Sequence, residues 1–218
     1  MIEATYVDHM GSDLSVVNAA RVSFGKKSEL ECIDMVKGVY VLSHKDTKLI
    51  QYLAKHRHTS PFGHAFATFH VKAPMFVARQ LVKHKFLRWN EISRRYVDSE
   101  PEFYLPTEWR GRSVDAKQGS AGVVDVGDWG DVNWACLKAY KDLLSHGVCP
   151  EQARMVLPQS TMTEWYWSGS LDAFSDMCVL RCANDTQAET QEVAAAISVK
   201  MHELFPVSWM ALGIGRQQ

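Results

Sequence analysis

The side chains between residues 65 and 73 alternate in character, and this alternation constrains the fold more than any other feature of the chain. One side is apolar and the other is mixed: Ala65, Ala67, Phe69 and Val71 against Phe66, Thr68, His70 and Lys72. A two-residue period is typical of a β-strand that buries one face. Pro74 closes the predicted strand, because proline cannot donate a hydrogen bond to a β-ladder.

The segment that follows this strand predicts a helix. Residues 75–85 contain no glycine or proline, and their aliphatic and aromatic side chains form a broad apolar surface. Gln80, Lys83 and His84 are three and four residues apart, so one edge of this helix would present all three to a ligand.

The last part of the chain is predicted to be mainly helical. Helices are expected at about 131–146 and, more briefly, between residues 150 and 158. Ser170 is a suitable N-cap for a further helix. The final predicted helix covers about 186–204 and ends at Pro206. Its buried side carries Val193, Ala194, Ile197, Met201 and Leu204.

The length of 218 residues favours one compact domain that covers residues 1–218. Apolar residues make up 46% and charged residues 22%, which is typical of a chain that folds. The segment from Gly111 to Gly130 carries five glycines and little hydrophobic periodicity, so it is predicted to be a long loop or insertion. Such loops tend to be functional, and this one is a candidate active-site or subunit-contact element.

The charge of the chain favours a small anionic ligand over a polymer. A net charge of −1 argues against a nucleic-acid polymer as partner, because nonspecific affinity for polyanions requires a basic excess. Positive charge is nevertheless concentrated between Arg79 and Arg95, where the only acid is Glu91. A phosphorylated ligand such as a nucleotide matches this local excess.

The five cysteines indicate a reducing compartment. Their number is odd, and no two have the two-residue spacing of zinc knuckles or redox motifs, so free thiols in the cytoplasm are expected. The chain lacks about 18 consecutive apolar residues, and its first residues lack the pattern of a secretory signal. We therefore expect neither a membrane span nor export.

Arg181 is the most informative single position, because helical spacing places it on the same face as Phe174, Met177 and Cys178. An arginine on an apolar face requires a partner. One interpretation is a structural ion pair with a carboxylate, and long side chains also reach the surface. The other is that its planar donor fork binds an anion or a heterocycle. The residues alone leave both interpretations open.

The segment from Asn90 to Tyr96 is rich in hydrogen-bonding groups and contains one aliphatic residue. It is either a solvated loop or a cluster of serine, arginine and backbone donors that holds a phosphate. Within it, Glu91 is suited to a ribose hydroxyl or a flavin edge.

The histidines do not predict a metal site. Five of the nine histidines cluster at His56, His58, His64, His70 and His84, without the spacing of a catalytic metal centre, so no metal is expected. No serine or cysteine has a neighbouring base that would make it a recognisable nucleophile.

Together these residues resemble the flavin-dependent thymidylate synthase family, of which the chain looks like a divergent, phage-like member. The family pattern is Arg-His-Arg, a seven-residue gap, and a serine within Asn-Glu-x-Ser-x-Arg-Tyr. Here it reads Lys83-His84-Lys85 and then Ser93-Arg94-Arg95-Tyr96. Other blocks follow in the family's order: Ala20–Phe24, His58–Phe62, Phe76–Gln80, Ala153–Pro158, and Leu180-Arg181 followed by Gln187.

The resemblance implies an α/β (α+β) fold in which a mixed sheet is flanked by helices. It implies a homotetramer whose active sites are each assembled from several subunits around FAD. The implied reaction is the reductive methylation of dUMP to dTMP, with 5,10-methylenetetrahydrofolate as methylene donor and NADPH as the reductant of FAD. No covalent enzyme cysteine is needed, in agreement with the absence of an activated thiol pattern.

The resemblance also implies roles for individual residues. Arg181 resembles the catalytic arginine that binds the uracil edge and stabilises its ionised form. The implied dUMP contacts are Gln80, Lys83, Glu91, Ser93, Arg94, Arg95, Arg154 and Arg181. The implied cofactor contacts are His58, Ser60, Lys83, His84, Lys85, Asn90, Glu91, Ser170 and Asp176, with His58 near both flavin and folate.

Several positions depart from the family pattern and leave two other functions open. Lys83 and Lys85 replace arginines, Gly63 replaces a glutamate, and Ser170 and Asp176 stand where asparagines often contact FAD. One alternative is a related hydroxymethylase that acts at C5 of dUMP or dCMP. The other is a non-catalytic nucleotide- or RNA-binding protein on the same fold. A phage-encoded protein would act in the cytoplasm of the host.

The two lysines predict weaker FAD binding, because a lysine is a point charge that lacks the bidentate fork of an arginine. Titration of the apoprotein with FAD is expected to give a severalfold lower dissociation constant in Lys83→Arg and Lys85→Arg variants than in the wild type. An unchanged constant in both variants would remove this argument.

Overall fold

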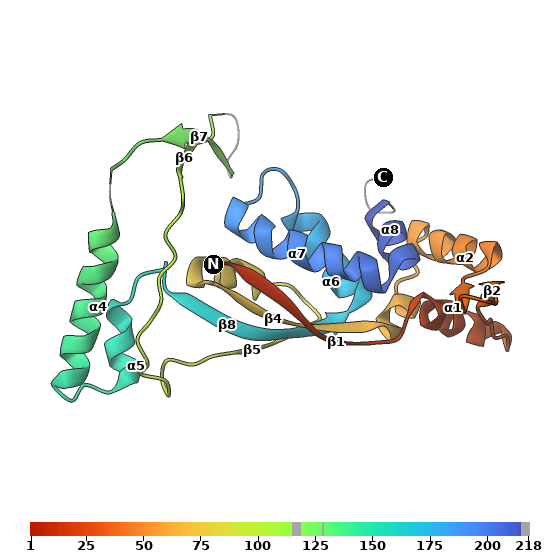
Figure 1. Ribbon diagram of the computed structural model, residues 1–218, viewed down its shortest axis with the longest axis horizontal. Helices are drawn as coiled ribbons and strands as arrows, with labels where there is room; N and C mark the ends of the chain where they lie inside the picture. The colour runs from red at the N-terminus through yellow and green to blue at the C-terminus, as the bar shows by residue number, and fades with distance from the viewer. Residues whose placement is uncertain (115–118, 128, 215–218) are drawn as a thin grey trace.

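A four-stranded sheet runs through the centre of the molecule in the order β1, β4, β8, β5 (Figure 1). Its strands are β1 (Glu3–Met10), β4 (Phe66–Pro74), β8 (Met162–Ser170) and β5 (Leu87–Glu91). The computed structural model describes residues 1–114, 119–127 and 129–214. The α+β class with flanking helices is confirmed. The pairs β1–β4, β4–β8 and β5–β8 are all antiparallel, whereas a mixed sheet was expected. One buried and one polar face per strand is the usual pattern of antiparallel sheets.

The pairing of β4 with β8 forms the middle of the sheet and continues in register from Phe66, opposite Ser170, to the far end of both strands. The apolar side of β4 is buried, as the alternation predicts: Ala67, Phe69, Val71 and Ala73. On β8, Trp165 and Trp167 lie opposite residues of this apolar side and are buried with them. The predicted strand is therefore confirmed.

Three helices pack against the buried side of the sheet: α3 (Met75–Leu81), α6 (Leu171–Arg181) and α7 (Ala188–Leu204). Figure 1 shows α6 and α7 lying along the sheet. Phe174 of α6 contacts both Phe69 and Trp167, with ring centroids 5.3 and 5.6 Å apart. The helix that begins after Ser170 and the long final helix are thus present where the sequence places them.

Helix α3 is shorter than predicted. It ends at Leu81, whereas the sequence predicted a helix through Lys85. The chain must turn back so that β5 can begin with Leu87 opposite Gly169, and Phe86 adopts a left-handed φ of 64° in that turn. Lys83 and His84 therefore lie in the turn after α3 and not on a helical edge with Gln80.

The remaining elements extend the molecule at its two ends (Figure 1). One end holds α1 (Asp13–Arg21), α2 (His44–Lys55) and the strand pair β2 (Glu31–Asp34) and β3 (Val39–Val41). The other end holds α4 (Gly130–Ser145) and α5 (Pro150–Ala153), which agree with the predicted helices. Short 3-10 helices cover residues 22–24, 60–64 and 154–156.

The chain forms one more helix after α7, α8 (Pro206–Ile214), which the sequence analysis did not anticipate. Pro206 follows the end of α7 and also opens α8, because a proline is favourable at the first helical position. The Asp13 carboxylate accepts hydrogen bonds from the N–H groups of Val207 and Ser208 at 3.0 and 2.9 Å. Asp13 thereby caps the helix from a distant part of the chain.

The glycine-rich segment 111–130 is more regular than a loop. β6 (Trp109–Arg112) pairs with β7 (Ser120–Val124), and together they form the β6–β7 hairpin. Gly111 is required by close approach, because a Cβ atom there would lie 2.7 Å from the Ala121 carbonyl oxygen. Residues 115–118 and 128 of the segment lie outside the described residues.

None of the helices in the described ranges is long and apolar enough to cross a membrane. The five cysteines are free thiols.

Candidate functional site

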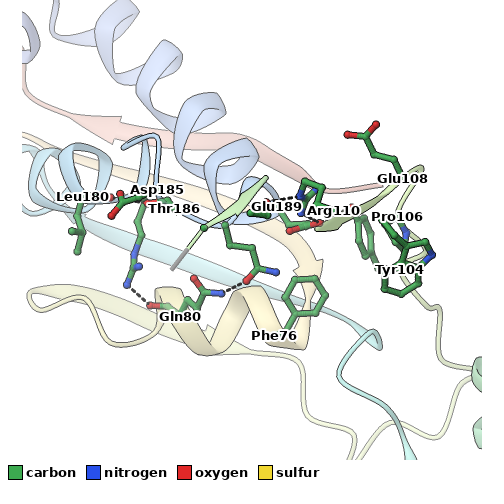
Figure 2. Close-up of a pocket in the computed structure, with 15 residues that line it drawn as sticks. Phe76, Gln80, Tyr104, Pro106, Glu108, Arg110, Leu180, Asp185, Thr186 and Glu189 are labelled. Atoms are coloured by element: carbon green, nitrogen blue, oxygen red, sulfur yellow. Dashed lines mark hydrogen bonds and ion pairs between the residues drawn. The ribbon is translucent and has the colours of Figure 1, made fainter. Parts of the chain in front are cut away.

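A cavity of about 570 Å³ lies where the end of α3 meets the connection between α6 and α7 (Figure 2). Residues of the β6–β7 hairpin and of the segment before it form its other wall. The lining residues with functional groups relevant here are Gln80, Tyr104, Arg110, Arg181, Gln187 and Glu189. The volume is within the range of pockets that bind small ligands.

Arg181 is the last residue of α6, and its guanidinium reaches the end of α3. Its Nε donates to Nε2 of His84 at 3.0 Å, and its Nη2 donates to the carbonyl oxygen of Gln80 at 3.2 Å. A carboxylate ion pair with Arg181 is absent among the described residues. The structure therefore gives Arg181 polar partners that do not cancel its charge, which favours the ligand-binding interpretation over the structural ion pair.

The imidazole of His84 is neutral at physiological pH. Burial and the charge of Arg181 lower the pKa of His84 to about 4. Because Nε2 accepts the hydrogen bond from Arg181, the single proton of the neutral ring is carried by Nδ1. His84 thus orients the guanidinium and leaves its positive charge for a ligand.

The side chain of Gln80 is held by two hydrogen bonds to α7 and the residue before it. Its Nε2 donates to Oε1 of Gln187 at 2.5 Å, and its Oε1 accepts from the Thr190 hydroxyl at 3.3 Å. Thr190 is fully buried, so the amide of Gln80 has a fixed anchor. Gln80 and Gln187 therefore form a rigid polar wall next to Arg181.

The opposite wall contains a second arginine, which is paired with a buried acid. Nη2 of Arg110 donates to Oε1 of Glu189 at 2.5 Å, and the hydroxyl of Tyr104 donates to the same oxygen at 3.4 Å. Burial raises the pKa of Glu189, but the hydrogen bond and charge of Arg110, together with hydrogen bonds from the backbone and Gln187, keep the pKa below its ordinary value. Burial and the neighbouring Glu189 raise the pKa of Tyr104 to about 12.

These contacts fasten the β6–β7 hairpin to the rest of the cavity. Nε of Arg110 donates to the Ser120 hydroxyl across the hairpin at 3.0 Å. Gly119 has a φ of +87°, and a Cβ atom there would lie 3.1 Å from the carbonyl oxygen of Asp185. The hairpin backbone therefore lies directly on the connection between α6 and α7.

The sequence analysis did not identify Tyr104, Arg110 or Glu189 as site residues. Glu189 offered a signal, because it lies four residues before Val193 on the buried side of α7, where an acid requires a partner. Arg110 offered none, since its partner is far away in the sequence.

Most of the other predicted dUMP contacts lie around the end of β5. Glu91, its last residue, accepts hydrogen bonds from Thr163 at 2.6 Å and from the Trp89 indole at 3.1 Å. Residues 93–97 then form a turn, the Ser93 turn, in which Nε of Arg95 donates to the Ser93 hydroxyl at 3.3 Å. Arg94, in the same turn, donates to the Ser99 carbonyl oxygen. The two remaining predicted dUMP contacts lie elsewhere: Arg154 is exposed after α5, and Lys83 is exposed in the turn after α3.

The predicted cofactor contacts lie on several elements. His58 is exposed after α2, Ser60 is exposed as the first residue of the 3-10 helix at 60–64, and Asn90 is exposed on β5. Lys83 and Lys85 are exposed on either side of His84. Ser170 is buried at the end of β8, and Asp176 is exposed on α6.

Within one chain, the structure therefore brings together only part of the predicted site. Of the predicted residues, Gln80 and Arg181 line the cavity, and His84 is bonded to Arg181. The Ser93 turn and Arg154 are not among its described lining residues. The roles assigned to these separate residues remain predictions. In the described ranges, no group of three or more potential metal ligands is found.

Comparison with known protein families gives one match to most of the chain. The model of the family described as thymidylate synthase complementing protein matches residues 5–207. The flavin-dependent thymidylate synthase of Thermus thermophilus is 39% identical over 209 residues, which cover 94% of this chain and 73% of that protein. The protein of the same name from Thermosipho africanus is 37% identical over 214 residues, with coverage of 94% and 88%.

A solved structure extends this similarity to the fold. The chain resembles the UMP/dUMP methylase PolB from Streptomyces cacaoi, bound with 5-Br dUMP, at a TM-score of 0.83 and 30% identity. The similarity covers 98% of this chain and 95% of that one. The same methylase bound with 5-Br UMP gives a TM-score of 0.80 and 29% identity.

The state of His84 can be measured by nuclear magnetic resonance of the imidazole nitrogens. We expect a neutral ring with its proton on Nδ1 at a pH midway between 4 and 6.5. Since the folded pKa lies below the unfolded one, the contribution of His84 to stability is complete above about pH 6.5 and is lost as the pH falls toward 4. In an Arg181→Met variant the pKa of His84 should rise, because one of its two causes is removed. A charged His84 at the midway pH in the wild type would contradict this account.

Proposed function

The chain belongs to the thymidylate synthase complementing protein family, and on this premise we propose that it is a flavin-dependent thymidylate synthase that methylates dUMP to dTMP. The observation that carries the proposal is the state of Arg181. Its guanidinium is held by an uncharged imidazole and a backbone carbonyl at the edge of a cavity that is large enough for a ligand. This arrangement suits a substrate that becomes more negative during the reaction.

Arg181 is the proposed catalytic residue and binds the acceptor edge of the uracil ring. Donors that point at a uracil carbonyl stabilise the negative charge that spreads over the ring when C5 acts as a nucleophile. A guanidinium already paired with a carboxylate would provide less of this stabilisation. His84 acts as a positioning residue, since it accepts from Nε of Arg181 without adding charge.

The proposal names FAD as the flavin, 5,10-methylenetetrahydrofolate as the source of the methylene group, and NADPH as the reductant. When bound, FAD would supply the hydride chemistry that side chains cannot perform. The residues fit a phosphate-bearing cofactor, because Lys83 and Lys85 are exposed in the turn after α3 and provide two cations for a pyrophosphate. Ser60 and Asn90 add exposed hydrogen-bonding groups on other elements.

The phosphate of dUMP is proposed to bind at the Ser93 turn. There the Ser93 hydroxyl and the Arg95 guanidinium lie within 3.3 Å of each other, so both can donate to one phosphate. Arg154 is exposed and contributes a further guanidinium. Nη1 of Arg94 is engaged with the Ser99 carbonyl at 2.8 Å, so Arg94 would use its other donors.

We propose that the protein is a homotetramer with shared active sites, in which the Arg181 cavity of one subunit meets the Ser93 turn and Arg154 of another. β5 is an edge strand of the sheet, and the Ser93 turn follows it outside the Arg181 cavity. A second subunit can therefore present its Ser93 turn and Arg154 to the cavity of the first. This explains why one chain holds the residues for the uracil and for the phosphate in different places.

The function is tested by the product and by Arg181. Incubation of the FAD-loaded protein with dUMP, methylenetetrahydrofolate and NADPH should yield dTMP, and an additional oxygen in the product mass would identify a hydroxymethylase instead. In Arg181→Ala, kcat/KM is expected to fall by about 10² or more, as for the loss of one donor at a developing negative charge. Circular dichroism should remain that of the wild type.

Two variants serve as controls for Arg181→Ala. Arg181→Lys keeps the charge but loses the planar fork, so its kcat should lie between those of Arg181→Ala and the wild type. Arg79→Ala removes an exposed arginine from the same region of α3 and should leave turnover unchanged. Turnover of Arg181→Ala within about tenfold of the wild type, a loss of under about 1.4 kcal/mol, would reject the proposed mechanism.

A further inference from the structure

The carboxylate of Glu189 has one oxygen with two donors and one oxygen with none. Oε1 accepts from Arg110 and Tyr104, whereas Oε2 is buried and receives no hydrogen bond among the described residues. Gln187 helps to lower the pKa of Glu189 but makes no hydrogen bond of normal geometry to Oε2. Only 4% of Glu189 is exposed, so bulk water does not readily replace the missing donor. A buried charged acceptor without a donor is costly, which indicates that a bound molecule supplies one.

Glu189 borders the same cavity as Arg181 and Gln80, and it lies on α7 beside Arg110 of the hairpin (Figure 2). Its position is fixed, because Arg110 holds Oε1 from β6 while α7 holds the backbone. A ligand that fills the cavity can therefore reach both Arg181 and Glu189.

Arg181 and Glu189 require opposite hydrogen-bonding groups on that ligand. Arg181 only donates hydrogen bonds, and an ionised Glu189 only accepts them. In a uridine nucleotide the carbonyl oxygens of the base meet the requirement of Arg181. The phosphate is repelled by Glu189, and the N–H of the uracil ring lies between the two carbonyls, on the edge that Arg181 takes. The hydroxyl of the sugar is the donor that remains.

We propose that Glu189 is a substrate-binding residue whose Oε2 accepts a hydrogen bond from the 3′-hydroxyl of the nucleotide sugar. This inference rests on the proposed function, which places a uridine nucleotide in the cavity, and it adds a contact on the sugar. Arg110 and Tyr104 are positioning residues for it, because they hold the other oxygen of the carboxylate. The acid thereby selects nucleotides with a free 3′-hydroxyl and disfavours those with a phosphate at that position.

The test compares dUMP with 2′,3′-dideoxyuridine 5′-monophosphate, which lacks only the hydroxyl in question. Isothermal titration of the FAD-loaded wild type should give weaker binding of the dideoxy nucleotide by about tenfold to a hundredfold, as for a hydrogen bond to a charged group. In Glu189→Leu the two nucleotides should bind with nearly equal affinity. Glu189→Gln keeps the shape and an acceptor for Arg110, so it should fold and show a clearly smaller difference than the wild type.

Glu108→Gln is the matched control, because it removes another acid that lines the cavity and leaves the Glu189 carboxylate and its ion pair with Arg110 in place. This variant should retain a preference for dUMP over the dideoxy nucleotide even if both bind more weakly. Equal preferences in the wild type, Glu189→Leu and Glu189→Gln would overturn the inference and leave the proposed function intact. Loss of the preference in Glu108→Gln as well would assign the preference to the general negative charge of the cavity and would overturn the role of Glu189. Failure of the wild type to bind dUMP at all would reject both proposals.

Discussion

The antiparallel pairing of β4 with β8 is the constraint on which the rest of the structure depends. Each strand is followed immediately by a helix, α3 after Pro74 and α6 after Ser170, and these residues lie at opposite ends of the paired strands. Both helices return across the same buried side of the sheet, so their C-terminal ends converge. Arg181 at the end of α6 thereby meets the Gln80 carbonyl and His84 at the end of α3. The cavity forms at this meeting point.

The electrostatic arrangement of the cavity follows from which charges are paired. Arg181 has uncharged partners among the described residues, so its charge is directed at a ligand. Arg110 is neutralised by Glu189 and serves to hold the hairpin and the carboxylate in place. The cavity therefore offers a charged donor at Arg181 and a charged acceptor at Glu189. A uridine nucleotide, with carbonyls on the base and a hydroxyl on the sugar, matches this division.

Patterns in the local sequence predicted the helices and strands that depend mainly on neighbouring residues. The alternation in β4 and the periodicity of α6 and α7 predicted those elements, and the helical face of α6 predicted that Arg181 needs a partner. The helical propensity after Pro74 continues beyond Leu81, but the pairing of β5 with β8 ends α3 there. The pairs Arg110–Glu189 and Asp13–Ser208 join residues far apart in the sequence, so no local pattern announces them. The glycines that allow the β6–β7 hairpin also interrupt the alternation of apolar and polar side chains by which its strands could have been predicted.

The central claim is that one nucleotide is held by the Arg181 cavity of one subunit and the Ser93 turn of another. Subunit complementation tests it most directly. Arg181→Ala and Ser93→Ala chains, each expected to be strongly impaired alone, would be co-expressed with different tags, and the mixed oligomer purified by both tags would be assayed for dTMP formation. Shared sites predict that activity returns, because some sites then combine an intact Arg181 with an intact Ser93. A mixed oligomer that forms but remains as inactive as either variant alone would contradict the account.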